Sequence, residues 1–189
     1  MDPLPRLVAV VGPTASGKSA LALRLARALR GEILNADSMQ VYRRMDIGTA
    51  KPSAEERRLI PHHLIDILDP DQDYSAFLFR EQAGPIIDRL HQEGTPILVV
   101  GGTGLYLKAL TRGLIASPGA DPEVRRILKG RAAREGVSVL YGELSEVDPA
   151  AAARIHPGDL LRIVRALEVH FQTRRPISEF QVAHGFQEK

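Results

Sequence analysis

The chain has 189 residues, 44% of them hydrophobic, so it is long enough to bury a core, and its formal net charge is only +2. It contains no cysteine, which excludes disulfides and cysteine-ligated metal and fits a reducing compartment. The longest apolar runs, 7–11 and 97–100, are far too short to span a membrane, and the start does not read as a signal peptide. We therefore expect a soluble, cytoplasmic monomer without a membrane partner.

The first part of the chain predicts a strand, a helix and a second strand. Residues 7–11 form an apolar, β-branched run before a glycine, which is typical of a buried strand. A helix is expected over residues 16–29, and an extended pattern returns at residues 32–36. This order is that of a βαβ unit, so a parallel sheet is expected. The apolar face predicted for the helix consists of Leu21, Ala22, Leu25 and Leu29.

A second helix is expected from Ser75 to about Gly94. Pro85 lies inside it and should kink or split it, because proline removes a backbone donor. Residues 97–100 form the next strand, and residues 101–104 are too rich in glycine to continue a sheet. Since substrates collect at the carboxyl ends of strands in open α/β sheets, the three strand-end loops at residues 12–19, 35–40 and 101–106 are expected to converge on one binding cleft.

The chain is predicted to divide into three segments. Residues 1–112 form an α/β core, a parallel sheet flanked by helices. From about residue 113 the alternation of strands and helices stops, and charged helical stretches indicate a mainly helical insertion over residues 113–156. Residues 157–189 carry an amphipathic helix from about 160 to 171, capped by Asp159, which we expect to return to the core.

The strongest chemical signal lies where the first strand meets the first helix. Residues 12–19 match the P-loop pattern G-x-x-x-x-G-K-[ST], which predicts a P-loop NTPase-like fold. Backbone amides and the positive helix end hold phosphate oxygens, Lys18 adds a charge, and the Ser19 hydroxyl is a ligand for Mg²⁺. The predicted diphosphate-binding residues are Gly12, Pro13, Thr14, Ala15, Ser16, Gly17, Lys18 and Ser19.

A P-loop does not by itself identify the ligand, and ATP would be the usual one. An ATPase normally adds a metal-orienting aspartate at the end of an apolar strand, whereas the strand at 97–100 ends in glycines. Asp66 is a weaker candidate for that role, because only two apolar residues precede it. A P-loop small-molecule kinase therefore stays open at this point.

Other polar residues have more than one interpretation. Asp37 follows the second strand at the predicted cleft, where its carboxylate suits a general base, but an Asp-Ser pair after a strand also commonly forms a turn. His62 and His63 are adjacent, so in a strand they point to opposite faces, and no closely spaced ligand completes a metal site. Neither histidine is given a role, and Lys51 is not given one either.

Six motifs together resemble the signatures of the tRNA dimethylallyltransferases, and the resemblance covers most of the chain. It implies transfer of a dimethylallyl group from dimethylallyl diphosphate to N6 of the adenosine 3′-adjacent to the anticodon, with release of diphosphate. The partners implied are the tRNA anticodon stem-loop and dimethylallyl diphosphate, with Mg²⁺ as cofactor. The motifs are GPTASGKS at 12–19, NADSMQVY at 35–42, DIGTAKP at 46–52, PHHLID at 61–66, GGTGLY at 101–106 and RALEV at 165–169.

The resemblance also assigns roles to individual residues. It implies that Asp37 is the base that takes the N6 proton and that Thr103 lies in the reaction channel, where its hydroxyl positions substrate or simply forms a turn. Basic residues from Arg125 to Arg134 are candidates to support the anticodon stem. The residues expected to contact tRNA are Asp37, Ser38, Met39, Gln40, Leu161, Arg162, Ile163, Val164 and Arg165.

The chain departs from the family pattern at its end. Family members continue beyond the position of Lys189, so we expect a fragment or a truncated relative, with exposed apolar surface where the remainder docks. Two further alternatives to tRNA prenylation stay open: a prenyltransferase acting on free adenine nucleotides, and a non-catalytic RNA-binding protein.

Overall fold

The computed structural model describes residues 7–184 and forms two compact units, which divide after Thr111. The predicted segments 1–112, 113–156 and 157–189 differ from this division, because the structure groups the last two in one unit. The outermost residues of the first and third segments lie outside the described residues. Within residues 7–184, no helix is both long enough and apolar enough to cross a bilayer.

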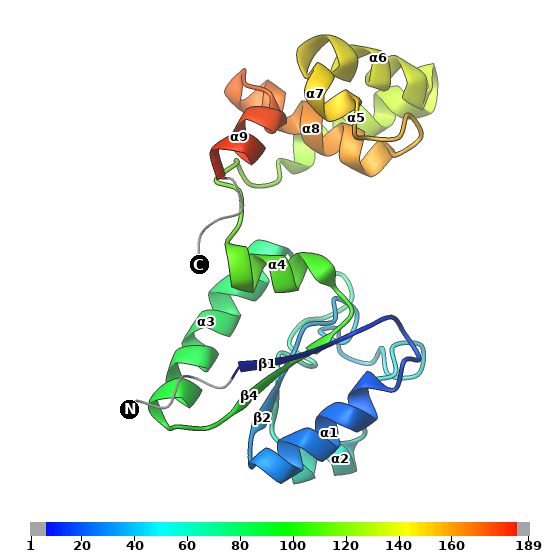
Figure 1. Ribbon diagram of the computed structural model, residues 1–189. Coiled ribbons are helices and arrows are strands. Elements are labelled where there is room, and N and C mark those ends of the chain that lie inside the picture. The colour runs from blue at the N-terminus through cyan, green and yellow to red at the C-terminus, as the bar shows by residue number, and fades with distance from the viewer. Residues whose placement is uncertain (1–6, 185–189) are drawn as a thin grey trace. The chain divides into compact units, whose positions relative to one another are not determined.

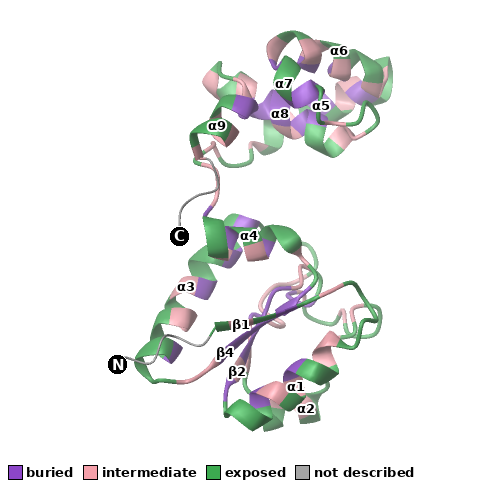
Figure 2. Cartoon of the chain, viewed as in Figure 1, coloured by how far each residue is buried: buried purple, intermediate pink, exposed green. Residues whose placement is uncertain are grey.

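A parallel sheet of four strands, in the order β1-β4-β2-β3, forms the centre of the first unit (Figure 1). Every residue of β4 is buried because it pairs with β1 on one side and β2 on the other, whereas β1 at the sheet edge is largely exposed (Figure 2). The strands predicted at 7–11, 32–36 and 97–100 are thus present. The strands are β1 (Leu7–Val11), β2 (Glu32–Asn35), β3 (His62–His63) and β4 (Ile97–Gly101).

Helices cover both faces of this sheet, with α1 on one side and α3 on the other (Figure 1). The buried face of α1 consists of Ala22 and Ala26, whereas Leu21 and Leu29 are exposed. The predicted leucine stripe was therefore partly wrong. Alanines face the sheet because the helix packs closely on the central strands, next to Val10 and other core side chains. The helices of this unit are α1 (Lys18–Leu29), α2 (Ala54–Leu59), α3 (Ala76–Gln92) and α4 (Gly104–Arg112).

Helix α3 runs without a break through Pro85, so the expected split does not occur. Its start is fixed as predicted, since the Ser75 hydroxyl accepts a hydrogen bond from the Leu78 amide at 3.2 Å. Phe79 and Leu90, before and after the proline, are both fully buried. Packing on both sides of the proline compensates for the one backbone hydrogen bond that the ring removes.

The second unit is a helical bundle with its own hydrophobic core. Its largest fully buried side chains include Leu128, Leu140, Leu144, Ile163 and Leu167, which come from α5, α6 and α8. The apolar stripe predicted for the helix near residues 160–171 is thus used inside this unit. The helices are α5 (Pro122–Glu135), α6 (Val137–Val147), α7 (Pro149–Ala152), α8 (Leu160–Thr173) and α9 (Ile177–His184).

A buried carboxylate, Glu168 on α8, ties this bundle together. Its side chain is fully buried and accepts hydrogen bonds from Arg125 at 2.8 Å, from Arg165 at 2.5 Å and from the Asp121 amide at 2.7 Å. Burial alone would raise the pKa of Glu168, but these donors outweigh it and hold the pKa below its usual value. The start of α5 is thereby fixed to α8.

Candidate functional site

The P-loop connects β1 to α1 and leaves the helix N-terminus open. Gly17, the N-cap residue, has a φ of 79° and no side chain with which to cap the helix, and Ala15 also has a positive φ of 64°. The first amides of a helix have no acceptor within the helix, and together with the macrodipole they attract anions. The Lys18 ammonium lies close by and donates to the Pro13 carbonyl oxygen at 3.2 Å.

Two adjoining cavities open next to this loop. The first, about 420 Å³ in volume, lies over the P-loop and is also lined by Met39, Gly48 and Thr49. The second, about 250 Å³, extends between α1, β2 and residues 50–65. A ligand bound by its phosphates in the first cavity therefore has a second one open beside it. Both cavities are lined by Lys18, Ser19, Ala20, Asp37, Gln40 and Ala50.

The two cavities are bordered by different parts of the fold. Residues 14–19 of the P-loop border the first one, which brings the Lys18 side chain and the N-terminal end of α1 to it. Aliphatic side chains wall part of the second, and this part suits a small apolar group, whereas Asn35, Lys51, Glu56 and His62 also line it. Its aliphatic lining residues are Ala22, Leu23, Ile33, Ile65 and Val100.

Asp37 lies where the two cavities meet, in a turn that buried polar groups shape. Its Oδ1 accepts a hydrogen bond from the Met39 amide at 2.9 Å, and its own amide donates to Asn35 Oδ1 at 3.1 Å. The Asn35 amide group donates in turn to the Leu64 carbonyl oxygen at 2.9 Å. Asp37 therefore does form the turn considered from the sequence, while one carboxylate oxygen is left to act on a ligand.

The loop after β4 comes directly beside this turn. Thr103 Oγ1 accepts a hydrogen bond from the Ser38 amide at 2.9 Å, and the Thr103 amide donates to the Ala36 carbonyl oxygen at 3.2 Å. A Cβ added to Gly102 would lie 3.3 Å from the Gly12 carbonyl oxygen, so this loop also borders the P-loop. The three strand-end loops predicted to converge are thus brought together.

Aromatic rings pack against Tyr106, which lies at the start of the helix that follows the Thr103 loop. Tyr106 is 4% exposed and stacks on Phe79, with ring centroids 4.4 Å apart, and Tyr74 meets it edge-on at 6.0 Å. Burial, with smaller contributions from Tyr42 and Asp37, raises the pKa of Tyr106 to about 12. The Tyr106 hydroxyl therefore stays protonated at neutral pH, and this ring is a rigid, neutral support rather than a proton acceptor.

Comparisons with known proteins agree with this geometry. The family model described as IPP transferase matches residues 40–189, and the model described as isopentenyl transferase matches residues 5–63. The chain belongs to the IPP transferase family. It is 60% identical over 181 residues to the tRNA dimethylallyltransferase of Geobacter metallireducens and 56% identical to that of Geobacter sulfurreducens. These alignments cover 96% of this chain but only 59% and 58% of the two relatives.

Solved structures of IPP transferases show the same fold. A structure of a eukaryotic dimethylallyltransferase acting on tRNA aligns with a TM-score of 0.77 at 32% identity, covering 97% of this chain and 46% of that one. The tRNA isopentenylpyrophosphate transferase of Bacillus halodurans aligns with a TM-score of 0.58 at 46% identity, covering 91% of this chain and 57% of that one. The expected P-loop NTPase-like α/β fold is thus confirmed. The chain spans somewhat over half the length of its curated relatives.

Of the tRNA-contacting residues that the family resemblance implies near Asp37, two remain accessible. Ser38 is partly exposed and Met39 is 45% exposed. Gln40 is buried, and its side-chain amide donates to the carbonyl oxygens of Thr49 at 3.0 Å and Ala50 at 3.2 Å. Its side chain thus holds the neighbouring loop, and contact of Gln40 with tRNA stays a prediction.

The predicted tRNA-contacting residues on α8, residues 161–165, also differ in burial. Leu161 is 72% exposed and the Arg162 side chain 73%, so both can reach a partner. Ile163 and Val164 are core residues whose side chains point into the bundle, so the structure gives no support for RNA contact by these side chains, and that contact stays a prediction. Arg165 is committed to Glu168 and to residues 117–119, which removes it as a free phosphate ligand.

The basic stretch on α5 carries less free charge than its sequence indicates. Arg125 binds the buried Glu168, Arg126 pairs with Glu123 at 2.6 Å, and Arg131 pairs with Glu143 of α6 at 3.0 Å. These carboxylates neutralise guanidinium groups that were candidates for the anticodon stem. Residues 135–150 hold four acidic residues and no Lys or Arg, and Glu143 among them pairs with α5.

The histidine pair has partners within the fold. His62 Nδ1 lies 2.7 Å from the Ile60 carbonyl oxygen, and His63 Nε2 lies 2.6 Å from Glu32 Oε2. His62 lines the second cavity, where burial, with a smaller contribution from Arg57, lowers its pKa and favours the neutral ring. Among residues 7–184, no group of three or more His, Asp or Glu side chains is placed to hold a metal ion.

One polar cluster next to the cavities was not predicted. Lys51 and Arg57 both bind the carboxylate of Asp66, so Asp66 is not free to orient a metal ion as considered from the sequence. The signal that could have found this cluster is the presence of Asp46 and Lys51 in the motif DIGTAKP and of Asp66 in the motif PHHLID. Sequence spacing alone does not show that these motifs pair with each other.

Proposed function

We propose that this chain carries the donor site of an enzyme that transfers a dimethylallyl group from dimethylallyl diphosphate to N6 of the adenosine 3′-adjacent to the anticodon of tRNA, releasing diphosphate. One observation carries the proposal: in a chain of the IPP transferase family, Asp37 lines both the P-loop cavity and an adjoining cavity that is walled in part by aliphatic side chains. The substrates are therefore inferred from the family together with the chemistry of these two cavities.

The diphosphate of the donor is assigned to the P-loop cavity. As the allylic carbon–oxygen bond breaks, negative charge develops on the leaving diphosphate, and the P-loop amides, the helix dipole and Lys18 stabilise it where it forms. These donors are fixed by the fold before the ligand binds, so little reorganisation is required during the reaction. No phosphoryl group moves, which explains why a site of this kind needs no aspartate positioned as in an ATPase.

The five-carbon group of the donor is assigned to the adjoining cavity. A volume of about 250 Å³ is sufficient for a branched five-carbon chain, and aliphatic side chains such as Leu23 and Ile65 offer it an apolar lining. When the five-carbon group fills this cavity, it excludes water from the reactive allylic carbon. The allylic C1 then lies near Asp37, where the two cavities meet.

Asp37 is assigned as the base. The N6 nitrogen of adenine is a weak nucleophile because its lone pair is conjugated with the ring. As N6 bonds to C1 of the donor and the C1–oxygen bond breaks, the N6 proton passes to the Asp37 carboxylate and diphosphate leaves. The Met39 amide and the Thr103 loop orient this carboxylate, since Thr103 holds the following residue, Ser38.

Magnesium fits the P-loop cavity in a limited way. Ser19 lies in the first turn of α1 and lines both cavities, so its hydroxyl would be a ligand for Mg²⁺. Mg²⁺ commonly keeps most of its ligands from water and phosphate, which agrees with so few protein ligands here. When bound, the ion would neutralise charge on the leaving diphosphate.

The RNA partner is assigned to the tRNA anticodon stem-loop. The exposed residues Ser38 and Met39 next to the base, and Leu161 and Arg162 on α8, are the members of the predicted set that support this assignment. With tRNA as the proposed substrate, we assign the reaction to the cytoplasm. The expected monomeric state remains a prediction.

The decisive experiment is prenyl transfer to an unmodified anticodon stem-loop. The chain is incubated with dimethylallyl diphosphate, Mg²⁺ and the RNA, and mass spectrometry should show one added C5H8 group on the adenosine next to the anticodon. Asp37→Asn should abolish this product while leaving the affinity for inorganic pyrophosphate unchanged within about twofold, because the P-loop stays intact. Lys18→Ala should weaken pyrophosphate binding.

The same assay separates the alternatives. Replacing the RNA by AMP tests for prenylation of free nucleotides, and a titration with ATP tests for a kinase by the ligand that stabilises the fold. Product on AMP but not on the stem-loop, or stabilisation by ATP without transfer from the donor, would overturn the proposal. RNA binding without any transfer by the unaltered chain would favour the non-catalytic alternative.

A further inference from the structure

Lys51 is a buried ammonium beside the two cavities. Its side chain is only 1% exposed, and its Nζ donates to the Tyr42 carbonyl oxygen at 2.7 Å, to Asp46 Oδ1 at 2.8 Å and to Asp66 Oδ1 at 2.6 Å. A lysine ammonium has three donors, so all of them are used inside the protein. Although Lys51 lines the second cavity, it has no donor left for a ligand.

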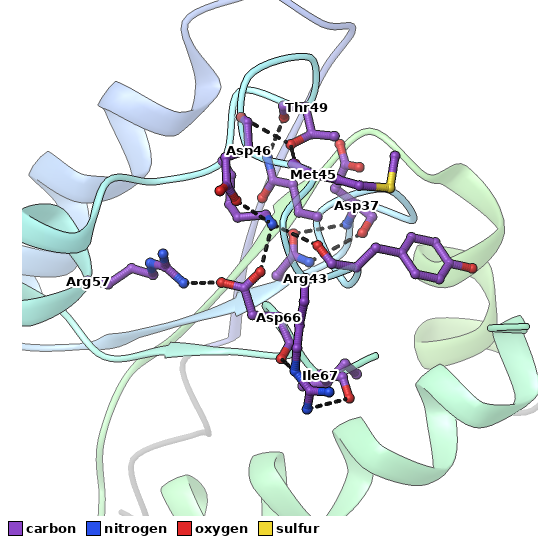
Figure 3. A network of polar contacts seen from close by, with 12 residues as sticks. Asp37, Arg43, Met45, Asp46, Thr49, Arg57, Asp66 and Ile67 are labelled. Atoms are coloured by element: carbon purple, nitrogen blue, oxygen red, sulfur yellow. Dashed lines mark hydrogen bonds and ion pairs between the residues drawn. The ribbon is translucent and has the colours of Figure 1, made fainter. Parts of the chain in front are cut away.

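Asp66 is the centre of the cluster that receives Lys51. Its second carboxylate oxygen binds Arg57, and the two side chains point toward each other in Figure 3. Its backbone is held as well, since its amide donates to the Gln40 carbonyl oxygen at 3.2 Å and its carbonyl oxygen accepts from Arg43 Nε at 3.0 Å. Asp66 therefore joins the turn after β2, the helix α2 and Lys51.

The segment that Lys51 holds forms one wall of the P-loop cavity. Lys51 binds the backbone at Tyr42 and the side chain of Asp46, which closes residues 42–51 into a compact loop. Residues 48–50 of this loop line the same cavity as the P-loop, and Gln40 further holds the carbonyl groups of Thr49 and Ala50. Both ends of the loop, Tyr42 and Lys51, are thus joined to Asp66 through the Lys51 ammonium.

The charges of this cluster stabilise the contacts between Lys51, Asp66 and Arg57. Burial would lower the pKa of Lys51, but the hydrogen bonds and charges of Asp46 and Asp66 outweigh it, so the pKa is raised. Burial would likewise raise the pKa of Asp66, but Lys51 and Arg57 hold it below the usual value. Both groups are therefore charged at neutral pH, and removing either leaves a partly buried charge without its partner.

We propose that Lys51 is a positioning residue, which through its bond to Asp66 holds the loop of residues 42–51 as a wall of the P-loop cavity and so sets the affinity for the diphosphate end of the donor. It acts through the loop rather than by contact with the phosphates. This inference rests on the proposed function, because it assumes that a diphosphate binds in this cavity.

The test compares Lys51→Met, which keeps the length of the side chain and removes the ammonium, with the unaltered chain. Calorimetry with inorganic pyrophosphate and Mg²⁺ should show binding weakened about tenfold or more, because this wall of the P-loop cavity is no longer held. In the prenyl-transfer assay, KM for the donor should rise while kcat at saturating donor stays within about threefold. A loss of folded protein alone would lower kcat and leave KM unchanged.

Two neighbouring variants serve as controls. Arg44→Met removes a cation from the same loop whose ion pair with Asp69 is exposed, and it should leave pyrophosphate binding unchanged. Asp66→Asn keeps the shape of the acceptor and removes its charge, and it should shift binding in the same direction as Lys51→Met. If Lys51→Met does not fold, Asp66→Asn supplies the measurement.

The outcomes for the inference and for the proposed function differ. If the unaltered chain does not bind pyrophosphate, the assigned phosphate site is wrong and the inference falls with it. If the unaltered chain binds pyrophosphate and transfers the prenyl group, but Lys51→Met and Asp66→Asn do so with equal affinity and KM, only the role of Lys51 is overturned.

Discussion

The Thr103 hydroxyl accepts a hydrogen bond from the Ser38 amide at 2.9 Å, which joins the loop after β4 to the turn that carries the proposed base. Thr103→Val removes this acceptor and keeps the side-chain volume. Because the turn is then less firmly held, we expect kcat for prenyl transfer to fall about tenfold with little change in KM for the donor. A lost hydrogen bond of this kind also costs about 1 kcal/mol of stability, which chemical denaturation can measure.

Thr103→Ser is the matched variant, since it keeps the hydroxyl and loses only the methyl group. It should retain most of the activity. If Thr103→Val is as active as Thr103→Ser, the hydroxyl has no role in orienting the turn.

Gly101, the last residue of β4, has no room for a side chain. A Cβ at this position would lie far inside van der Waals contact with the Ala36 carbonyl carbon and oxygen, which belong to the strand-end backbone rather than to a flexible side chain. Gly101→Ala should therefore force β2 and β4 apart and lower the free energy of unfolding by about 1–3 kcal/mol.

Gly142 in α6 provides the opposite case. A Cβ there would meet no atom within 4 Å, so Gly142→Ala should raise the stability by about 0.5–1 kcal/mol through helix propensity. Urea unfolding followed by circular dichroism measures both variants. Equal stability of the two would show that the close approach at Gly101 relaxes at no cost.

Features that depend on residues close together in the chain could be predicted from the sequence. The P-loop between β1 and α1, the position of β4 and the N-caps at Ser75 and Asp159 follow from neighbouring residues, and the structure contains them all. The convergence of the strand-end loops also followed, because parallel strands place their carboxyl ends at one edge of a sheet.

Features that depend on distant partners were not predictable in this way. Burial of Ile163, Val164 and Gln40 depends on which face of an element meets its neighbours, and a family resemblance over a short stretch does not resolve single faces. The pairing of Lys51 with Asp66 joins two motifs that are not adjacent in the chain, so no periodicity indicates it. On α1 the prediction of Ala22 as a buried residue was right, but Ala26 was missed and Leu21 and Leu29 were wrongly included, because the closeness of helix to sheet outweighed the preference for leucine.

The assignment of the five-carbon group to the second cavity predicts how the size of this cavity affects donor binding. Ile65 lines this cavity but not the P-loop cavity, so Ile65→Trp should fill space assigned to the five-carbon group. We expect KM for dimethylallyl diphosphate to rise about tenfold, while the affinity for inorganic pyrophosphate stays unchanged. Leu59→Trp on the exposed side of α2, where Leu59 is 69% exposed, is the control and should leave both values unchanged. An equal loss of pyrophosphate affinity in Ile65→Trp would place the whole donor elsewhere.

The buried Glu168 makes stability of the second unit dependent on pH. Its pKa in the folded protein lies below the usual 4.5, because the hydrogen bonds from Arg125 and Arg165 outweigh the effect of burial. The native state therefore binds this proton less readily than the unfolded state does, and the resulting stability is present above pH 4.5 and lost as pH falls through the lower, folded-state pKa.

Glu168→Gln tests this dependence. At pH 7 we expect the variant to lose about 2 kcal/mol of stability, below the roughly 3–5 kcal/mol of a fully buried pair, because both guanidinium groups are partly exposed and screened by solvent. Between pH 7 and pH 3 the unaltered chain should lose more stability than the variant, since only the former still has this carboxylate to protonate. Urea unfolding at the two pH values measures the difference. Parallel losses in both proteins would mean that Glu168 is not the group that couples folding of the bundle to pH.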